Sequence, residues 1–464
     1  MYNRRRLLLI ALDWTRPKDP PLSLGHASIL ANLKKHQINV VEKSWAVNHS
    51  TFDTKNVHQF VINNLSANTD VAFGGFIWNE YPLQDIIRSI RTSRFTGRII
   101  LGGPQVSYLK KGLELHYPDV DIFIRGYAED ALAQLLLSPE KKPIIKGVHY
   151  AGEKDLGESA KVDLEQLPSP YLSGIIKPQG FIRFETQRGC PFTCSFCQHR
   201  ESDSSMQRRQ LEKSRIMQEI EWITRHKIIQ DVAVLDPTFN SGKNYMEVLR
   251  KFYEGMFSGK LALQSRAEMV TKEFLDAVEN INQHGQVVLE FGLQSTHKIE
   301  QALVDRPTNL SKVTSVLKEV SDRNIAAEVS LIFGLPGQTL SSYIESLRYC
   351  VDLKVPTIHA FPLMLLRGTP LYHAKESLQL VESSHEKPHN IPRVQERIPH
   401  VISSPSFTYL EWRKMATLAE MMEEKYNPAK PDEKPGVFSE IIKPFTSISP
   451  PPSLIKNYGF IKMT

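Results

Sequence analysis

The sequence predicts an α/β protein in which a doubly wound, Rossmann-like domain is followed by a partial (βα)6 barrel and a C-terminal extension. Apolar runs of strand length alternate with stretches of helical periodicity, first in residues 1–140 and again in residues 181–370. This alternation is typical of parallel sheets that are covered by helices. The second stretch holds six such units. A complete eight-unit barrel needs ~250 residues, so only part of a barrel is expected.

The first domain opens on the apolar run LLLIAL at residues 7–12. Arginines precede this run, as in a signal peptide. Asp13 and Arg16 follow it at once without a small-residue cleavage site, however, which favours a buried strand. Further strands are expected at residues 38–45, 71–78, 97–103 and 120–126, and helices at residues 26–36, 83–91 and 128–137.

Residues 141–180 are expected to form a linker with short strands, punctuated by Pro168-Ser169-Pro170. The barrel follows over residues 181–370. Its strands are expected at residues 181–186, 231–240, 261–269, 287–295, 326–337 and 358–366, and its helices at residues 211–226, 245–257, 272–280 and 310–323. The alternation ends after Gly368, so residues 371–464 are expected to form an extension of mixed helix and loop, with a helix at residues 409–426.

Charge and hydropathy indicate neither a nucleic-acid partner nor a membrane partner. The formal net charge is +6, and no block of Lys and Arg with interleaved aromatic residues stands out, so nucleic-acid binding is not indicated. No run of 18 or more apolar residues occurs, so no transmembrane helix and no membrane partner are expected. These features favour a cytoplasmic protein.

The four cysteines are distributed unevenly. Cys190, Cys194 and Cys197 form a C-x3-C-x2-C motif, and Cys350 is isolated. Pairing two of the three clustered cysteines would leave an odd one, so the pattern argues for a reducing compartment and a metal site. Thiolates suit an iron–sulfur cluster or zinc.

The motif has two interpretations, which differ in the metal that the cysteines would bind. Zinc could add His199 to the three cysteines, but the spacing Cys197-x-His199 is tighter than in zinc fingers and no second C-x2-C occurs. A [4Fe–4S] cluster usually has four thiolate ligands, so three would leave one iron open to chelate the amino and carboxylate groups of a substrate. A non-enzymatic iron–sulfur or zinc protein remains an alternative at this point.

The cysteine loop resembles that of the radical S-adenosylmethionine (SAM) superfamily. The shared features are the C-x3-C-x2-C spacing, the aromatic Phe196 before the third cysteine and an expected strand before the loop. The whole stretch of residues 185–197 is similar to the cobalamin-dependent branch of that superfamily. The resemblance implies one [4Fe–4S] cluster on Cys190, Cys194 and Cys197.

The expected barrel strands carry further family features behind the cysteines. The stretches LDPTFN, LEFGLQS, SLIFGLPGQT and FPLMLLRGT resemble the strand ends that surround SAM in relatives. The glycines of the third stretch would let the backbone approach a flat ligand. The SAM-binding residues implied by the resemblance are Phe196, Asp236, Thr238, Arg266, Glu290, Gln294, Ser295, Gly334, Pro336 and Leu363.

The first domain resembles the cobalamin (B12)-binding domains that precede many radical SAM enzymes. The matching pieces are VAFGGFIWN, IILGGPQVS and DIFIRGYAED, although the third departs from the family's Gly-Glu-Gly-Glu at two positions. No Asp-x-His-x-x-Gly loop occurs, so no histidine is expected to coordinate cobalt. A plain Rossmann-like scaffold without a cofactor is the alternative. The implied cobalamin-binding residues are Gly74, Gly75, Trp78, Asn79, Gly102, Gly103, Pro104, Gln105, Val106, Gly126 and Glu129.

The resemblance implies reductive cleavage of SAM to a 5′-deoxyadenosyl radical and, as the leading reading, methylation of an unactivated carbon. No side chain is assigned a catalytic role. A non-methylating rearrangement or cyclisation and a non-radical methyl transfer remain open. The expected partners are an unknown small-molecule or peptide substrate and an electron donor such as flavodoxin or ferredoxin. The enzyme chemistry itself would belong to the cofactors.

Overall fold

The computed structural model describes residues 5–66, 68–199, 208–385 and 397–446. The described chain divides into two compact units. Unit 1 comprises residues 1–192, 198–237 and 242–261, and unit 2 comprises residues 193–197, 238–241 and 262–464. This division falls inside the expected barrel, and the domain boundaries at residues 140, 180 and 370 stay a prediction.

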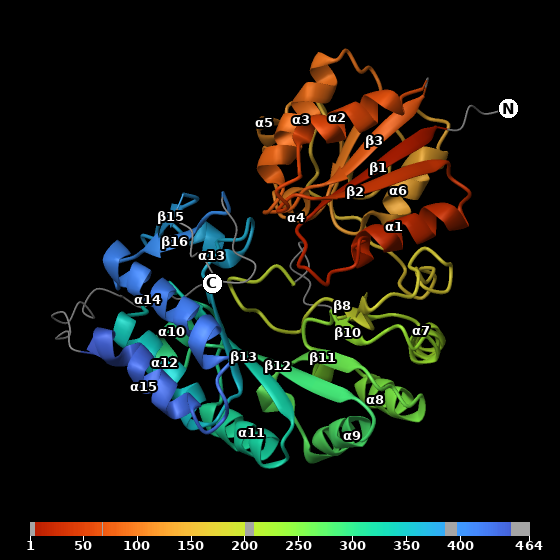
Figure 1. The fold of residues 1–464 in the computed structure, drawn as a ribbon. Helices are drawn as coiled ribbons and strands as arrows, with labels where there is room; N and C mark the ends of the chain where they lie inside the picture. The colour runs from red at the N-terminus through yellow and green to blue at the C-terminus, as the bar shows by residue number, and fades with distance from the viewer. Residues whose placement is uncertain (1–4, 67, 200–207, 386–396, 447–464) are drawn as a thin grey trace. The chain divides into compact units, whose positions relative to one another are not determined.

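Unit 1 contains a six-stranded sheet (Figure 1). The strands are β1 (Arg6–Asp13), β2 (Val40–Ala46), β3 (Thr69–Gly74), β4 (Ile99–Gly102), β5 (Ile122–Ile124) and β6 (Val148–Tyr150). Their order is β2-β1-β3-β4-β5-β6, and all pairs are parallel except the last, which is antiparallel. The order reverses between β1 and β3, as in doubly wound folds, whose ligands bind at the carboxyl ends of the strands.

Helices cover both faces of this sheet because alternate residues of β1 point to opposite sides. Leu8 and Ile10 belong to a core with α2 (Thr54–Asn63) and α3 (Glu80–Thr92). Leu7 and Leu9 belong to a second core with the remaining long helices. These are α1 (Leu24–Lys35) and α6 (Ala128–Leu137), and two short helices, α4 (Pro104–Ser107) and α5 (Leu113–His116), follow β4. The prediction of a doubly wound domain is confirmed, although α2 was not predicted.

The second sheet has the strand order β14-β13-β12-β11-β10-β7. The strands are β7 (Phe181–Phe184), β10 (Asp231–Val234), β11 (Lys260–Ser265), β12 (Gln286–Gln294), β13 (Ala326–Phe333) and β14 (Thr357–Pro362). The pairs β7–β10, β12–β13 and β13–β14 are parallel. The predicted six-stranded partial barrel is therefore confirmed in strand number and type. A short hairpin, β8 (Gln187–Arg188) with β9 (Arg209–Gln210), follows β7.

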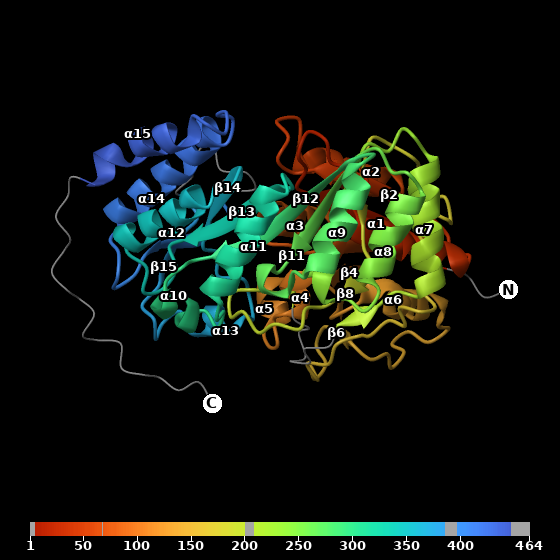
Figure 2. The ribbon, with the colours of Figure 1, turned by 90° about the horizontal axis from the view of Figure 1, so that it is seen from below.

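The helices between these strands are α7 (Lys213–Arg225), α8 (Tyr245–Glu254), α9 (Lys272–Asn282), α10 (Lys298–Leu303), α11 (Leu310–Asp322) and α12 (Leu340–Asp352). Four of the six, α7, α8, α9 and α11, lie close to their predicted ranges, and α10 and α12 were not predicted. Helices α9, α11 and α12 pack on strands β12 and β13 of unit 2 (Figure 2). Helix α12 was not predicted, although Thr339 and Ser342 form a capping box at its start.

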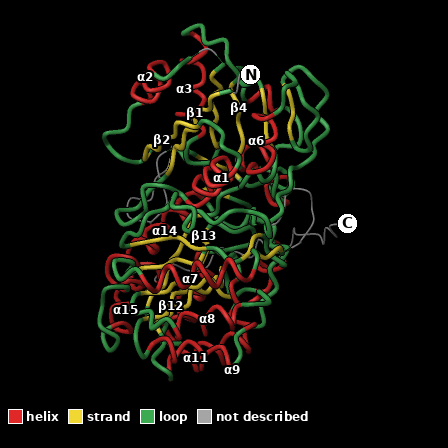
Figure 3. Tube along the Cα trace, turned by 90° about the vertical axis from the view of Figure 1, so that its right-hand side faces the viewer, coloured by secondary structure: helices red, strands yellow, loops and turns green. Residues whose placement is uncertain are grey.

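The C-terminal extension covers the free edge of β14. A predicted single helix at residues 409–426 is in fact α14 (Tyr409–Met421; Figure 3), which a π-helical turn, η3 (Met422–Tyr426), follows. Asn427, next in the chain, accepts a hydrogen bond from the Ile358 N–H and donates one to its carbonyl. These bonds satisfy backbone groups that an edge strand leaves unpaired.

The rest of the extension is made of short elements. Its described part contains α13 (Pro370–His373), β15 (Val381–Ser383), β16 (His400–Ser403) and α15 (Lys434–Thr446). Residues 386–396 and 447–464 of the predicted extension lie outside the described residues. In the part of the chain that is described, no helix combines the length and apolar character needed to cross a bilayer.

Candidate functional site

The boundary between the units passes through the cysteine loop. Cys190 belongs to unit 1 and is partly buried, while Cys194 and Cys197 belong to unit 2, where Cys194 is buried. All are free thiols. Within the described residues, no three His, Cys, Asp or Glu side chains meet at metal-binding distances. The ligand set of three cysteines therefore stays a prediction.

A cation lies beside the second cysteine. The Arg306 Nη1 is 3.5 Å from the Cys194 Sγ, and Nη2 of the same guanidinium donates to the Gly292 carbonyl of β12. The guanidinium therefore joins the cysteine loop to the end of β12. Arg306 was not among the predicted site residues. The sequence indicates Arg306 only as a charged residue that directly follows a helical stretch.

The same region collects two predicted SAM contacts. Gln294 has a left-handed backbone with φ +69°, and a Cβ added at Gly292 would lie 2.6 Å from its Nε2. The Gln294 side chain therefore lies over Gly292, on the strand face where Glu290 is also partly exposed. Cys194, Arg306 and Gln294 thus flank one short stretch of β12, where a ligand with amino and carboxylate groups would find polar partners.

The predicted SAM contacts divide by exposure. Phe196, Arg266, Glu290 and Gln294 are partly exposed. The remaining six are buried: Asp236, Thr238, Ser295, Gly334, Pro336 and Leu363. The Leu363 N–H donates to the Phe333 carbonyl, and the Leu363 carbonyl accepts from the Val401 N–H. Both backbone groups of this residue are therefore bonded within the protein.

Asp236 is another of these buried residues. Its carboxylate is fully buried and accepts hydrogen bonds from the Thr186 N–H at 2.7 Å, the Thr186 hydroxyl and the Gln187 N–H at 3.2 Å. Burial raises the pKa of Asp236 to about 7, although these hydrogen bonds oppose the rise. Its oxygens thus fix the backbone four residues before Cys190.

Gly334 and Gly337, the glycines at which a flat ligand was expected to approach, lie close to other parts of the protein. Gly334 has φ +85°, and a Cβ there would lie 3.2 Å from the Val401 carbonyl oxygen and 3.6 Å from Trp412. Gly337 has φ +77°, and a Cβ there would lie 2.8 Å from Leu303 of α10. The approach of a flat ligand to these two positions stays a prediction. The glycines allow a tight turn between α10 and the C-terminal extension.

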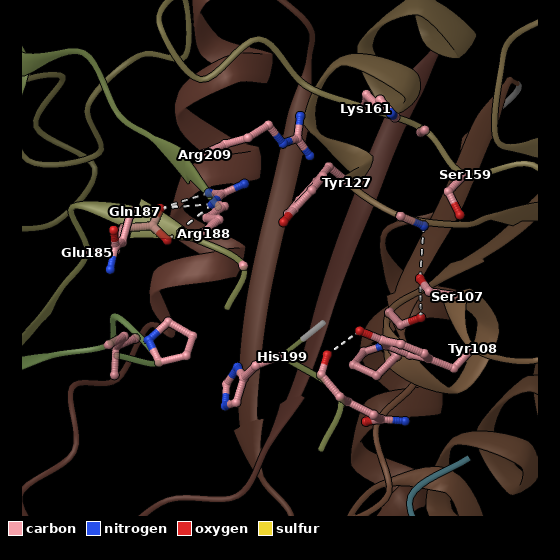
Figure 4. A pocket seen from close by; sticks show the side chains of 18 residues that line it. Ser107, Tyr108, Tyr127, Ser159, Lys161, Glu185, Gln187, Arg188, His199 and Arg209 are labelled. Atoms are coloured by element: carbon pink, nitrogen blue, oxygen red, sulfur yellow. Dashed lines mark hydrogen bonds and ion pairs between the residues drawn. The ribbon is translucent and has the colours of Figure 1, made fainter. Parts of the chain in front are cut away.

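Unit 1 contains a cavity of about 310 Å³ at the carboxyl ends of β4 and β5 (Figure 4). Three predicted cobalamin-binding residues, Gly103, Pro104 and Gly126, line it. The other lining residues are Ser107, Tyr108, Tyr127, Ser159, Ala160, Lys161, Glu185, Gln187, Arg188, Gly189, Gln198, His199, Arg209, Leu235 and Pro237. The cavity is thus formed by the first sheet together with residues on both sides of the cysteine loop.

Other predicted cobalamin contacts hold the loops in place. The Asn79 side chain is fully buried, donates to the Leu12 and Gly74 carbonyls and accepts from the Phe76 N–H. Trp78 donates to the Leu12 carbonyl. The remaining predicted contacts do not line the cavity either: Gly74, Gly75, Gly102, Gln105, Val106 and Glu129.

A buried ionic network forms one wall of the cavity. The Arg188 guanidinium contacts Glu129 at 2.7 Å and Glu185 at 2.8 Å. Burial opposes its charge, but the two carboxylates outweigh burial and raise the pKa of Arg188. The guanidinium carbons of Arg188 and Arg209 lie 5.2 and 4.9 Å from the centre of the Tyr127 ring. Tyr127 is therefore held by cation–π contacts beside the cavity, as Figure 4 shows.

Comparison with known proteins agrees with this architecture. Residues 184–350 match the sequence profile of the Radical SAM superfamily. The chain is 26% identical over 327 residues to the cobalamin-dependent radical SAM methyltransferase TokK of Streptomyces tokunonensis, covering 65% of this chain and 47% of TokK. It is 25% identical over 302 residues to the 2-(S-pantetheinyl)-carbapenam-3-carboxylate methyltransferase of Streptantibioticus cattleyicolor, covering 60% and 44%. The chain spans about half the length of these relatives.

Solved structures show the same fold. The radical SAM methyltransferase TsrM of Kitasatospora setae superposes with a TM-score of 0.65 over 88% of this chain and 80% of TsrM, at 14% identity. The cobalamin-dependent SAM radical enzyme OxsB superposes with a TM-score of 0.66 over 94% of this chain and 70% of OxsB, at 16% identity. Residues 184–350 of this chain therefore match the Radical SAM superfamily, and the chain is similar in sequence to TokK and in fold to TsrM and OxsB.

Proposed function

We propose that this protein is a cobalamin-dependent radical SAM methyltransferase that methylates an unactivated carbon of its substrate. The observation that carries the proposal is the C-x3-C-x2-C loop of the radical SAM domain, whose Cys194 lies beside Arg306. A polar cavity at the strand ends of the preceding Rossmann-like sheet supports the cobalamin part. The relative TokK, which is named a cobalamin-dependent radical SAM methyltransferase, supports the choice of reaction.

The donor set fits an iron–sulfur cluster. Cys190, Cys194 and Cys197 are soft ligands from one loop, and three thiolates leave one iron for SAM. The Arg306 guanidinium, whose Nη1 lies 3.5 Å from the Cys194 Sγ, would hold this part of the loop in place. Glu290 and Gln294 on the partly exposed face of β12 would orient SAM. When bound, the reduced cluster supplies the electron that cleaves SAM, and cobalamin supplies the methyl group.

The cavity in unit 1 fits one edge of a corrin. Its lining combines small residues, Gly103 and Gly126, with hydrogen-bonding side chains such as Ser107, Tyr108 and Lys161. Corrin amide groups need such donors and acceptors. A corrin is larger than this cavity, so it would extend beyond the cavity's opening. The lining includes His199, which becomes the histidine to test as a cobalt ligand.

The substrate and partners belong to the proposal as well. We expect a small-molecule or peptide substrate and a one-electron donor such as flavodoxin or ferredoxin. Free thiols at Cys190, Cys194 and Cys197 suit the reducing cytoplasm.

The test is anaerobic reconstitution followed by detection of 5′-deoxyadenosine. The wild-type protein should bind about four irons and four sulfides per chain and cleave SAM under dithionite. Replacing Cys190, Cys194 or Cys197 with alanine should abolish both. Cys350→Ala is the matched control, because Cys350 is fully buried in α12 and should affect neither. A cluster that survives loss of two of the three cysteines would refute the assignment.

A second candidate is a cobalamin-dependent radical reaction without methylation. A further relative, 21% identical over 277 residues, is an anaerobic magnesium-protoporphyrin IX monomethyl ester cyclase of Cereibacter sphaeroides. Product mass separates the candidates once a substrate is found. Methylation adds one methyl group, which carries deuterium when SAM is methyl-deuterated, whereas a rearrangement or cyclisation adds none.

A further inference from the structure

The short helix α10 in unit 2 is joined to two loops of the proposed site. Glu300 lies in its first turn and is 1% exposed. Its Oε2 accepts a hydrogen bond from the Ser295 hydroxyl at 2.5 Å and one from the Gln338 Nε2 at 3.2 Å. Ser295 follows β12, and Gln338 follows the turn after β13. One carboxyl group therefore connects α10 to the ends of two neighbouring strands.

Gln338 links Glu300 to the turn that contains Gly334 and Gly337, which is called the glycine turn below. It is fully buried, its Oε1 accepts from the Gly334 N–H at 2.7 Å, and its Nε2 also donates to the Ile332 carbonyl at 3.0 Å. Gly337 packs against the side chains of Ile299 and Leu303 on α10, where there is no room for a Cβ. The turn is therefore held to α10 by both hydrogen bonds and packing.

The other end of α10 is joined to the cysteine loop. The Val304 carbonyl, directly after the helix, accepts a hydrogen bond from the Ser195 N–H at 2.9 Å. Two residues further on, Arg306 contacts the Cys194 Sγ. Helix α10 thus connects the cysteine loop at one end to the glycine turn at the other.

We propose that Glu300 is a positioning residue that sets the place of the SAM-binding glycine turn relative to the cysteine loop. This inference rests on the proposed function, because it assumes that SAM binds along these strand ends. Glu300 touches neither ligand. It acts through Gln338 on the turn and through α10 on the loop.

The contact between Glu300 and Gln338 should be sensitive to a substitution of either residue. The Oε1 of Glu300 is buried and has no hydrogen-bond partner among the described residues, so its carboxyl group depends on the two donors at Oε2. A buried polar group that loses a donor is costly. Two carboxyl groups at this distance would repel each other when ionised. The amide of Gln338 is therefore the complement that Glu300 requires.

The experiment is a swap of the two side chains. Gln338→Glu should raise the KM and Kd for SAM about ten- to hundredfold, because the hydrogen bond that the Gln338 amide donates to Glu300 is lost in a buried place. At saturating SAM, the rate of deoxyadenosine formation should stay within about threefold of wild type. The double variant Glu300→Gln with Gln338→Glu again places an amide against a carboxyl group. It should recover most of the lost SAM affinity.

Both variants lose the bond from Gln338 to the Ile332 carbonyl. Any recovery of SAM affinity in the double variant therefore comes from the restored contact between residues 300 and 338. The matched control is Glu345→Gln, since Glu345 is exposed on α12 and accepts from Ser341 in the way that Glu300 accepts from Ser295. This control should leave the KM for SAM unchanged. Thermal unfolding of each purified variant identifies any that fails to fold.

The outcomes separate two kinds of failure. If the wild-type protein neither binds nor cleaves SAM, the proposed function is wrong. If the wild type binds SAM and Gln338→Glu has the same KM, or if the double variant is no better than Gln338→Glu, the positioning role is overturned. If Gln338→Glu alone fails to fold while the double variant folds and binds SAM normally, the pairing is supported.

Discussion

The strand-end glycines of unit 1 and unit 2 differ in what lies next to them. In unit 1, Gly103 and Gly126 have φ values of +90° and +78° and line an open cavity. In unit 2, Gly334 and Gly337 have similar φ values, but side chains from other elements of the protein pack against them. In all four cases an added Cβ would meet other parts of the protein. A glycine at a strand end therefore marks a close approach of chain segments and does not show whether a ligand is one of them.

The largest expected effect follows from Gly126 in unit 1. A Cβ at this position would lie 2.4 Å from the Ala160 carbonyl oxygen, and the backbone is left-handed. Gly126→Val should lower the free energy of unfolding by roughly 5 kcal/mol, from backbone strain and overpacking together. Gly152→Val is the control, because Gly152 has φ +81° but nothing within 4 Å. Its cost should be about 1–2 kcal/mol. Equal losses in thermal or urea unfolding would contradict the packing explanation.

The strands of both sheets could be predicted from the sequence because each strand is indicated by a short apolar run in its own residues. The apolar runs fixed every long strand to within a few residues, and the cysteine motif with its preceding strand identified the domain. The side-chain partners were not predictable in this way. The bonds from Thr186 to Asp236 were not predicted, and Glu300 was overlooked in a polar stretch with helical spacing. Both assignments depend on contacts between residues that are distant in the chain, which periodicity does not record.

The stability of the two units should depend on pH over different ranges, and the effect should be smaller than that of Gly126→Val. The pKa of Asp236 in unit 1 is raised from 3.8 to about 7, so the folded state holds its proton more tightly than the unfolded state. Its stabilising contribution is complete below about pH 4 and is lost as the pH rises through 7. The loss is at most roughly 4 kcal/mol. Hydrogen exchange should show the segment after β7 opening more readily across this window. Asp236→Asn should flatten that dependence, and an unchanged slope would contradict the assignment.

The stability of unit 2 should change at a higher pH than that of unit 1, and by a smaller amount. Burial lowers the pKa of His359 on β14, but hydrogen bonds with Glu328 and Glu423 outweigh it and raise the pKa to about 9. Its contribution is present below about pH 6.5 and is lost as the pH rises through 9. Because the cluster is partly exposed, about 1–2 kcal/mol is expected. Glu423→Gln should remove much of this dependence in β14 while leaving the Asp236 window unchanged. Loss of both windows together would show that the two networks are coupled.

The presence of both a [4Fe–4S] cluster and cobalamin on one chain is what the proposed function requires above all. The most direct test is electron paramagnetic resonance of the anaerobically reconstituted, dithionite-reduced protein supplied with hydroxocobalamin. We predict two signals from one sample, that of the reduced cluster and that of protein-bound cob(II)alamin, with no triplet splitting from an axial nitrogen. Triplet splitting that disappears in His199→Gln would assign His199 as a cobalt ligand and overturn the expectation that no histidine coordinates cobalt. An intact cluster signal with no protein-bound cob(II)alamin would contradict the assignment of a cobalamin-dependent enzyme.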